Sequence, residues 1–136
     1  MKTEKYLVKE KKKLNLYEVP TSYNGKLEKD EVKDKLIPAN IMKIREYQEK
    51  LYAENNQSLL IVLQAMDAAG KDSLIKNIMT GVNPQGTKVV SFKKPSENDL
   101  DHDYLWRVAK DLPPRGEIGI FNRSHYEDVL VSRVHN

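Results

Sequence analysis

The chain has 136 residues, of which 39% are hydrophobic and 32% charged, and this composition is typical of a single globular domain. No apolar run approaches the roughly 20 residues that span a bilayer, and the charged N-terminus lacks the apolar stretch of a secretory signal. The chain has no cysteine, which excludes disulfides and thiolate metal sites. We therefore expect a cytoplasmic protein without a membrane role.

The formal net charge of +3 comes from the N-terminus, where residues 1–13 hold six lysines and two glutamates. A short lysine-rich arm of this kind is more often solvated than bound to nucleic acid. Residues 14–38 contain turn formers without a sustained period, which favours an ordered extension lying over the domain. The predicted organisation is a basic arm and extension over residues 1–38 and a core over residues 39–136.

Strands and helices alternate along this core. A helix is predicted from the N-cap Asn40 to about Glu54, and the apolar run 59–63 predicts a strand buried on both faces. Further helices are predicted over 71–80 and 100–112 and from about residue 124, and further strands over 88–92 and 118–121. This order is typical of an α/β fold in which helices flank a parallel sheet.

The segment Gln64–Ser73 joins the first strand to a helix, where backbone N–H groups and the helix dipole favour a bound phosphate. It matches the phosphate-loop pattern G-x-x-x-x-G-K-[ST] at Gly70 and Lys71, but Ala65 replaces the first glycine and Asp72 replaces the hydroxyl. The alternative is a plain helix start that the next residues cap. The strand and helix on either side favour a phosphate site, for which the candidate contacts are Ala68, Ala69, Gly70, Asp72 and Ser73.

An acidic residue, Asp67, lies inside this predicted phosphate cradle. Its carboxylate would repel a polyphosphate unless a cation lay between them. Mg²⁺ binds one or two carboxylates together with phosphate oxygens, which Asp67 and Asp72 would offer. Asp67 could instead accept a proton from an attacking phosphate, while Lys71 would neutralise charge on the transferring phosphoryl group.

Ligands of open α/β sheets bind at the carboxyl ends of the strands, so the residues after the third strand should face the loop. Arg123 lies there and suits bidentate contact with a phosphate, although an ion pair with Glu127, four residues on, is the alternative. The lysine pair after the second strand could line a channel for a long anion or be solvated. The candidate phosphate contacts outside the loop are Asn83, Lys93, Lys94, Asn122 and Arg133.

Three segments together, Gln64–Asp72, Phe92–Ser96 and Ile118–His135, resemble the family-2 polyphosphate kinases, and the resemblance runs from about residue 39 to the last residue. It implies a thymidylate-kinase-like P-loop fold and Mg²⁺-dependent phosphoryl transfer between inorganic polyphosphate and an adenine or guanine nucleotide. The family's loop aspartate and lysine, which serve metal and phosphate, correspond to Asp67 and Lys71. The arginine after the third strand corresponds to Arg123.

The sequence departs from the family pattern at three places. Many members carry an aspartate at the position of Asn122, so Glu127 or Asp128 would have to supply a metal ligand there. The form Asn122–Glu127 resembles the branch that phosphorylates nucleoside monophosphates as well as diphosphates, and Ala65 replaces a usual glycine. Family members also continue beyond the equivalent of Asn136 with further strands and an arginine-rich lid. With the core incomplete in this way, we expect weak phosphate binding and low turnover.

Two other functions stay open at this stage. An ATP-dependent nucleoside monophosphate or small-molecule kinase would be expected to carry a hydroxyl at position 72 and the first glycine of the loop. A non-catalytic module that binds nucleotide or polyphosphate needs neither. A homo-oligomer also stays open.

Overall fold

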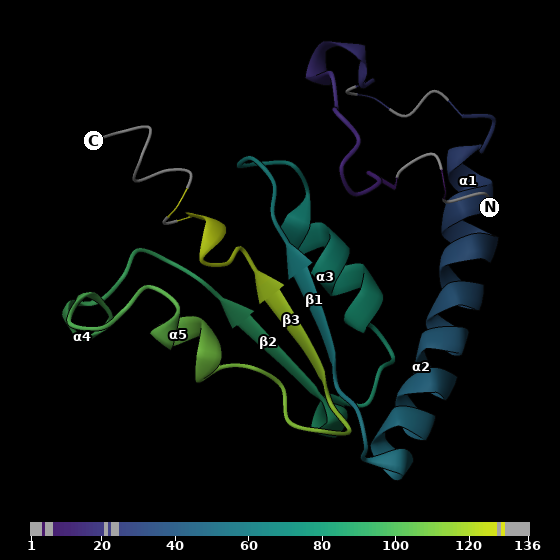
Figure 1. The fold of residues 1–136 in the computed structure, drawn as a ribbon. Helices are drawn as coiled ribbons and strands as arrows, with labels where there is room; N and C mark the ends of the chain where they lie inside the picture. The colour runs from purple at the N-terminus through teal and green to yellow at the C-terminus, as the bar shows by residue number, and fades with distance from the viewer. Residues whose placement is uncertain (1–3, 5–6, 21, 23–24, 128, 130–136) are drawn as a thin grey trace.

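The structure is a computed structural model that describes residues 4, 7–20, 22, 25–127 and 129 (Figure 1). Among these residues, three parallel strands form a sheet in the order β1-β3-β2. The strands are β1 (Leu59–Leu63), β2 (Thr87–Ser91) and β3 (Ile118–Asn122). Leu63 and Ser91 both pair with Asn122, so the three strands end at the same level. The predicted parallel sheet is confirmed, with β2 shifted by one residue and β3 longer by one. The predicted burial of β1 on both faces is wrong, since Leu59, Leu60 and Val62 are exposed on this edge strand.

The central strand β3 forms the core of the sheet. Ile118, Ile120 and Phe121 are buried, the last two at 1% exposure, because β3 has a neighbouring strand on each side and covered faces. Phe92, which follows β2, packs its ring edge-on against Phe121 with 4.8 Å between the ring centroids. An aromatic pair of this geometry stabilises a core by about 0.5–1.5 kcal/mol beyond the area it buries.

The helix before β1 begins earlier than predicted. It consists of α1 (Lys29–Glu31), the π-helical turn η3 (Val32–Leu36) and α2 (Ile37–Glu54). The prediction that Asn40 caps a new helix is therefore wrong, and helix crosses the predicted boundary after residue 38. Pro38 lacks an N–H, and its ring would crowd the carbonyl of Asp34 in a regular α-helix. The π-helical turn that contains Asp34 widens the helix there, which lets it continue through the proline.

A buried amide fixes the C-terminal half of α2 against the turn before β2. The Gln48 side chain is 1% exposed, its Nε2 donates to the carbonyl of Asn83 at 2.7 Å, and its Oε1 accepts from the Asn83 N–H at 2.9 Å. Asn83 caps the short 3-10 turn η4 (Pro84–Gly86). This contact lies where the strands begin, at the end of the sheet opposite to the loop after β1.

Helix α3 (Lys71–Met79) begins at the predicted residue and contacts both β3 and α2. The predicted helix over 100–112 is wrong. The structure has two short helices instead, α4 (Glu97–Leu100) and α5 (Trp106–Ala109). Ser96 and Asp99 form a capping box that starts α4 three residues early, and the carboxylate of Asp103 accepts the Leu105 N–H at 2.9 Å, a local bond that competes with a continuous helix.

Within the predicted arm and extension, residues 7–20 are exposed along their whole length, and the element they contain is the 3-10 turn η2 (Leu16–Glu18). Among the described helices, none is both long and apolar enough to cross a membrane. Of the predicted last helix, residues 126 and 127 are helical and the Val129 N–H bonds to the His125 carbonyl at 3.2 Å. The rest of that helix lies outside the described residues.

Candidate phosphate-binding site

Two residues of the loop between β1 and α3 have a left-handed backbone conformation before the helix begins. Ala68 has φ 60° and Gly70 has φ 93°, a conformation that glycine adopts without steric cost. No described side chain caps α3, whose N-cap is Gly70 itself. The first N–H groups of an α-helix have no helical carbonyl to bind, so those of α3 are available to an anion at the loop. The alternative interpretation was that Asp72 and Ser73 only cap the helix, and no capping bond among the described residues supports it.

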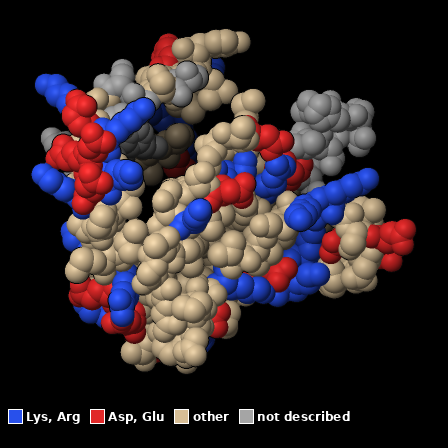
Figure 2. Space-filling model, turned by 180° about the vertical axis from the view of Figure 1, so that it is seen from behind, with Lys and Arg blue, Asp and Glu red and all other residues tan. Residues whose placement is uncertain are grey.

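The loop and the end of β3 line one pocket, as the topology predicts. It has a volume of about 240 Å³ and is lined by residues 67–73 together with Asn122 and Arg123. The Arg123 N–H donates to the Leu63 carbonyl at 3.0 Å, which continues the pairing of β1 and β3 by one residue. Seen from behind, acidic and basic side chains are intermixed toward the end at which the strands finish (Figure 2).

A second pocket, of about 440 Å³, continues from the first toward β2. It shares Asp72, Asn122 and Arg123 with the loop pocket and adds residues 91–94 and Glu127. Lys93 and Lys94 therefore line a groove that leads to the loop between β1 and α3. The Lys93 carbonyl accepts a bond of 2.9 Å from Nη1 of the buried Arg107, so this arginine fixes the backbone under the lysine pair.

The Lys71 ammonium folds back over the loop. Its Nζ donates to the carbonyl oxygens of Ala65 and Met66, at 2.7 and 2.8 Å. An ammonium has three donors, so one N–H of Lys71 remains for a ligand while two hold the amine at the loop. This arrangement keeps a positive charge beside the N-terminus of α3.

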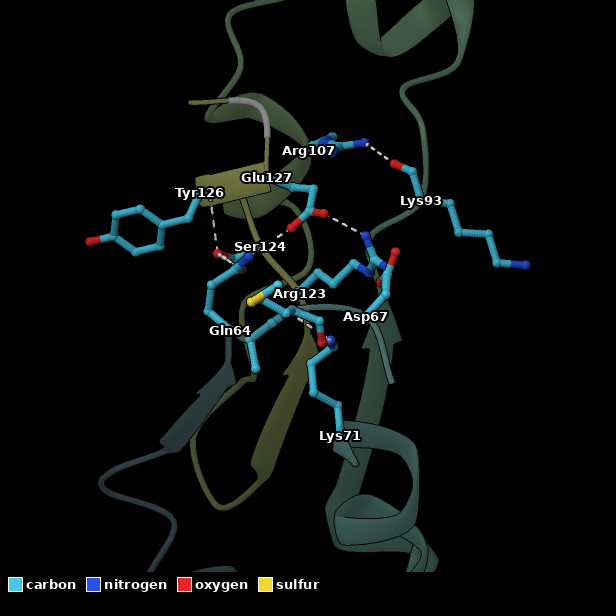
Figure 3. A network of polar contacts seen from close by, with 11 residues as sticks. Gln64, Asp67, Lys71, Lys93, Arg107, Arg123, Ser124, Tyr126 and Glu127 are labelled. Atoms are coloured by element: carbon cyan, nitrogen blue, oxygen red, sulfur yellow. Dashed lines mark hydrogen bonds and ion pairs between the residues drawn. The ribbon is translucent and has the colours of Figure 1, made fainter. Parts of the chain in front are cut away.

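Arg123 lies between two carboxylates (Figure 3). Its Nη2 forms an ion pair with Asp67 and its Nη1 forms one with Glu127, the pair expected at four-residue spacing. The second carboxylate oxygen of Glu127 accepts from Gln64 Nε2 at 2.6 Å. Arg123 also has φ 68°, a left-handed conformation that is unusual for a residue with a side chain. Strained backbone of this kind is concentrated at functional sites.

The acidic side chains of the site differ in exposure. The Asp67 side chain is 82% exposed, whereas that of Glu127 is 24% exposed and has both oxygens bonded to neighbours. Asp72 Oδ1 accepts a bond of 2.6 Å from Asn122 Nδ2. Among the described residues, no three His, Cys, Asp or Glu side chains gather in a cluster that could hold a metal ion. A cation here would take its remaining ligands from water and phosphate, which is the usual environment of Mg²⁺.

The structure gathers most of the predicted contacts and leaves Asn83 apart. Asn83 lies at the opposite edge of the sheet, where its side chain accepts the Gln85 N–H at 3.0 Å and its backbone binds Gln48. Arg133 lies outside the described residues. Two residues that the sequence analysis did not assign join the network, Gln64 and Arg107. For Gln64 the available signal was an amide directly after an apolar strand.

Comparisons with known proteins agree with this geometry. Residues 26–136 match the family model described as Polyphosphate kinase 2. The chain is 46% identical over 135 residues to an ADP-polyphosphate phosphotransferase of Rhodopseudomonas palustris, covering 99% of this chain and 47% of that protein. It is 56% identical over 94 residues to an AMP/ADP-polyphosphate phosphotransferase of Meiothermus ruber, covering 69% of this chain and 35% of that protein.

The fold is also similar to a solved structure of the same family. The crystal structure of polyphosphate kinase 2 from Arthrobacter aurescens TC1 matches with a TM-score of 0.82 at 38% identity, covering 90% of this chain and 45% of that one. The chain thus spans about half the length of the solved structure and less than half of the two named relatives. The sequence match, the parallel sheet and the shared fold agree, and the chain belongs to the polyphosphate kinase 2 family.

Proposed function

We propose that this chain serves phosphoryl transfer between inorganic polyphosphate and a nucleotide, converting AMP or ADP to ADP or ATP, or the reverse. The observation that carries the proposal is the meeting of Asp67, Lys71 and Arg123, from two different strand ends, in one pocket at the N-terminus of α3. Support also comes from the two relatives named above, whose names give polyphosphate together with ADP or with AMP and ADP.

In the proposed reaction, an oxygen of the nucleotide's terminal phosphate forms a bond to the terminal phosphorus of polyphosphate. The bridging P–O bond behind that phosphorus breaks, and the shortened polyphosphate leaves with the electron pair. The backbone N–H groups at the start of α3 and the Lys71 ammonium would hold the phosphoryl oxygens on which charge is spread. Arg123 would orient the phosphate that attacks or leaves.

Mg²⁺ is the cofactor that we propose for this site. The exposed Asp67 carboxylate and Asp72 both line the loop pocket. Together they offer the one or two carboxylates that Mg²⁺ binds in addition to phosphate. Mg²⁺ bound there would neutralise charge on the phosphate oxygens. With both oxygens of Glu127 bonded to protein groups, a metal role for that residue would require it to release Arg123 or Gln64.

The groove lined by Lys93 and Lys94 is the proposed path of the polyphosphate chain. It joins the loop pocket through Asp72, Asn122 and Arg123, so an anion with several phosphates could reach the loop along it. The two lysines carry point charges without a directional fork, which suits a repeating anion that slides in register.

The test is an incubation with Mg²⁺, AMP or ADP, and either long-chain polyphosphate or ATP, followed by chromatography of the nucleotides. We expect new nucleotide from polyphosphate, and its loss in Lys71→Ala. Lys76→Ala is the matched control, since Lys76 is exposed in the last turn of α3 and away from the pocket. If turnover is low, calorimetric titration of the protein with tripolyphosphate in the presence of Mg²⁺ provides a second readout. Turnover from ATP alone, or no tripolyphosphate binding by the unmodified chain, would overturn the proposal.

A further inference from the structure

Gln64 connects the end of β1 to the segment after β3 through both ends of its amide. Its Nε2 donates to Glu127 Oε2 at 2.6 Å, and its Oε1 accepts from Ser124 Oγ at 3.4 Å. Ser124 is fully buried, and its Oγ accepts the Tyr126 N–H at 3.2 Å, which leaves the hydroxyl proton for Gln64. The two contacts fix which end of the Gln64 amide faces Glu127 (Figure 3).

The two ion pairs of Arg123 are unequal. Glu127 is sheltered at 24% exposure and is itself held by Gln64, whereas Asp67 is 82% exposed and stands on the loop. Water and salt weaken an exposed ion pair much more than a sheltered one with further hydrogen bonds. The contact with Asp67 is therefore the one that a ligand can exchange, and the contact with Glu127 is the one that persists.

We propose that Gln64 and Glu127 are a positioning pair that holds the Arg123 guanidinium at the mouth of the loop pocket, ready for a phosphate. The pair assigns Glu127 to Arg123 rather than to a metal. An arginine has many rotamers, and one that is already held loses less conformational freedom when it binds an anion. The left-handed backbone of Arg123 agrees with this role, since such a conformation persists only where the surroundings hold it.

The proposal rests on the proposed function only for the identity of the anion. That Gln64 holds Glu127, and through it Arg123, is a claim about the free protein. It can therefore be tested without any ligand, by an experiment whose outcome does not depend on whether the chain binds polyphosphate.

The first experiment observes the Arg123 guanidinium by NMR in ¹⁵N-labelled protein, with its signals assigned from Arg123→Lys. In the unmodified chain we expect separate, slowly exchanging Nη–H signals for Arg123. In Gln64→Met, which keeps the length of the side chain and removes its hydrogen bonds, these signals should merge through faster rotation. Gln57→Met is the matched control. Gln57 is exposed beyond the other end of β1, and its contact within the described part of the chain is through its backbone carbonyl, which accepts from the Gly116 N–H.

The second experiment is a calorimetric titration with tripolyphosphate in the presence of Mg²⁺. Gln64→Met changes no charge, so a change in affinity reports the position of Arg123 and not the field at the site. We expect Kd to rise about tenfold in Gln64→Met and to stay unchanged in Gln57→Met. In a Glu127→Gln background the same substitution of Gln64 should have no further effect, because the two residues act as one unit.

The outcomes separate the two proposals. No tripolyphosphate binding by the unmodified chain overturns the proposed function, and the NMR comparison still decides the role of Gln64. Arg123 signals that are unchanged in Gln64→Met overturn the positioning pair, and so does an unchanged Kd beside altered signals. If Gln64→Met fails to fold, as its amide spectrum would show, Gln64→Ala takes its place in both experiments under the same criteria.

Discussion

Asn122 donates a hydrogen bond of 2.6 Å from its side-chain amide to the carboxylate of Asp72. The bond joins the last residue of β3 to the first turn of α3, and both residues line the two pockets of the site. The amide supplies a donor where a carboxylate would supply a second negative charge. The side chain at position 122 therefore decides whether the Asp72 carboxylate has a hydrogen-bond donor of the protein or faces a second carboxylate, whose repulsion only a cation would relieve.

Replacing this amide by a carboxylate should make the stability of the chain depend on Mg²⁺. Asn122→Asp places two carboxylates in contact, so we expect the free energy of unfolding to fall by about 1–3 kcal/mol in EDTA. Millimolar Mg²⁺ should restore most of the loss by bridging the two carboxylates. Thermal unfolding with and without Mg²⁺ measures both effects.

The control is Asn56→Asp, at an exposed position before β1. It should change neither the free energy of unfolding in EDTA nor the effect of Mg²⁺ on it. An Asn122→Asp chain that is as stable as the unmodified one in EDTA would show that Asp72 can turn away from residue 122. The hydrogen bond would then have no part in holding the loop.

Asp67→Asn should change anion binding in opposite directions with and without metal. In EDTA the loss of a negative charge inside the proposed phosphate cradle should lower the Kd for tripolyphosphate by about fivefold, because it removes a repulsion of about 1 kcal/mol at an exposed site. With Mg²⁺ present, the loss of the proposed ligand should instead raise Kd by about tenfold. Calorimetric titrations in the two buffers test the reversal. Asp101→Asn, at the exposed C-terminus of α4, should show neither change.

The sequence is informative about this site because the loop and the residue that follows β3 are set by local rules. An apolar strand, a glycine with positive φ and an amphipathic helix predict where a phosphate would lie, and parallel pairing predicts that Arg123 faces it. The pair of Arg123 with Glu127 was expected from helical four-residue spacing, and it forms although Arg123 lies before the helix with a left-handed backbone. These features depend on neighbours along the chain or on one rule of topology.

The features that were missed depend on contacts between distant segments. The pairing of Arg123 with Asp67 joins residues 56 positions apart, and that of Gln64 with Glu127 joins residues 63 apart. No spacing along the chain encodes them. The helix start before Pro38 was missed for a different reason, since a π-helical turn accommodates a proline that the usual rule takes as a break.

Gln48 should matter for stability and leave the site unaffected. Its buried amide makes two hydrogen bonds to the backbone of Asn83. Gln48→Leu would remove both, so the Asn83 N–H would lose its partner, while the Asn83 carbonyl would keep its contacts with the Gly86 N–H and Thr87 Oγ1. We expect a loss of about 1–2 kcal/mol in the free energy of unfolding, measured by urea denaturation. Tripolyphosphate affinity of the folded fraction should stay unchanged, because Asn83 lies at the opposite edge of the sheet. A weakened affinity would instead support the sequence prediction that Asn83 contacts phosphate.

Two glycine substitutions should separate a conformational cost from a steric one. A Cβ at Gly70 would meet nothing within 4 Å among the described residues, but its φ of 93° strains any other residue. A Cβ at Gly119, in the middle of β3, would lie 2.8 Å from Pro113 Cγ, in a backbone conformation that any residue adopts. The cost of a side chain at Gly70 therefore arises from the backbone conformation alone. The cost at Gly119 arises from packing between the sheet and the segment before β3.

Gly70→Ala should therefore lower the free energy of unfolding by about 1–2 kcal/mol and weaken tripolyphosphate binding, since relief of the strain moves the N–H groups at the start of α3. Gly119→Ala should cost about 1–3 kcal/mol through overpacking against Pro113 and leave binding unchanged. The double variant Gly119→Ala with Pro113→Ala should recover part of that cost, because the clash loses its partner atoms. Urea denaturation and calorimetry on the same samples decide between the two mechanisms, and recovery of Gly70→Ala by the Pro113 substitution would contradict the assignment.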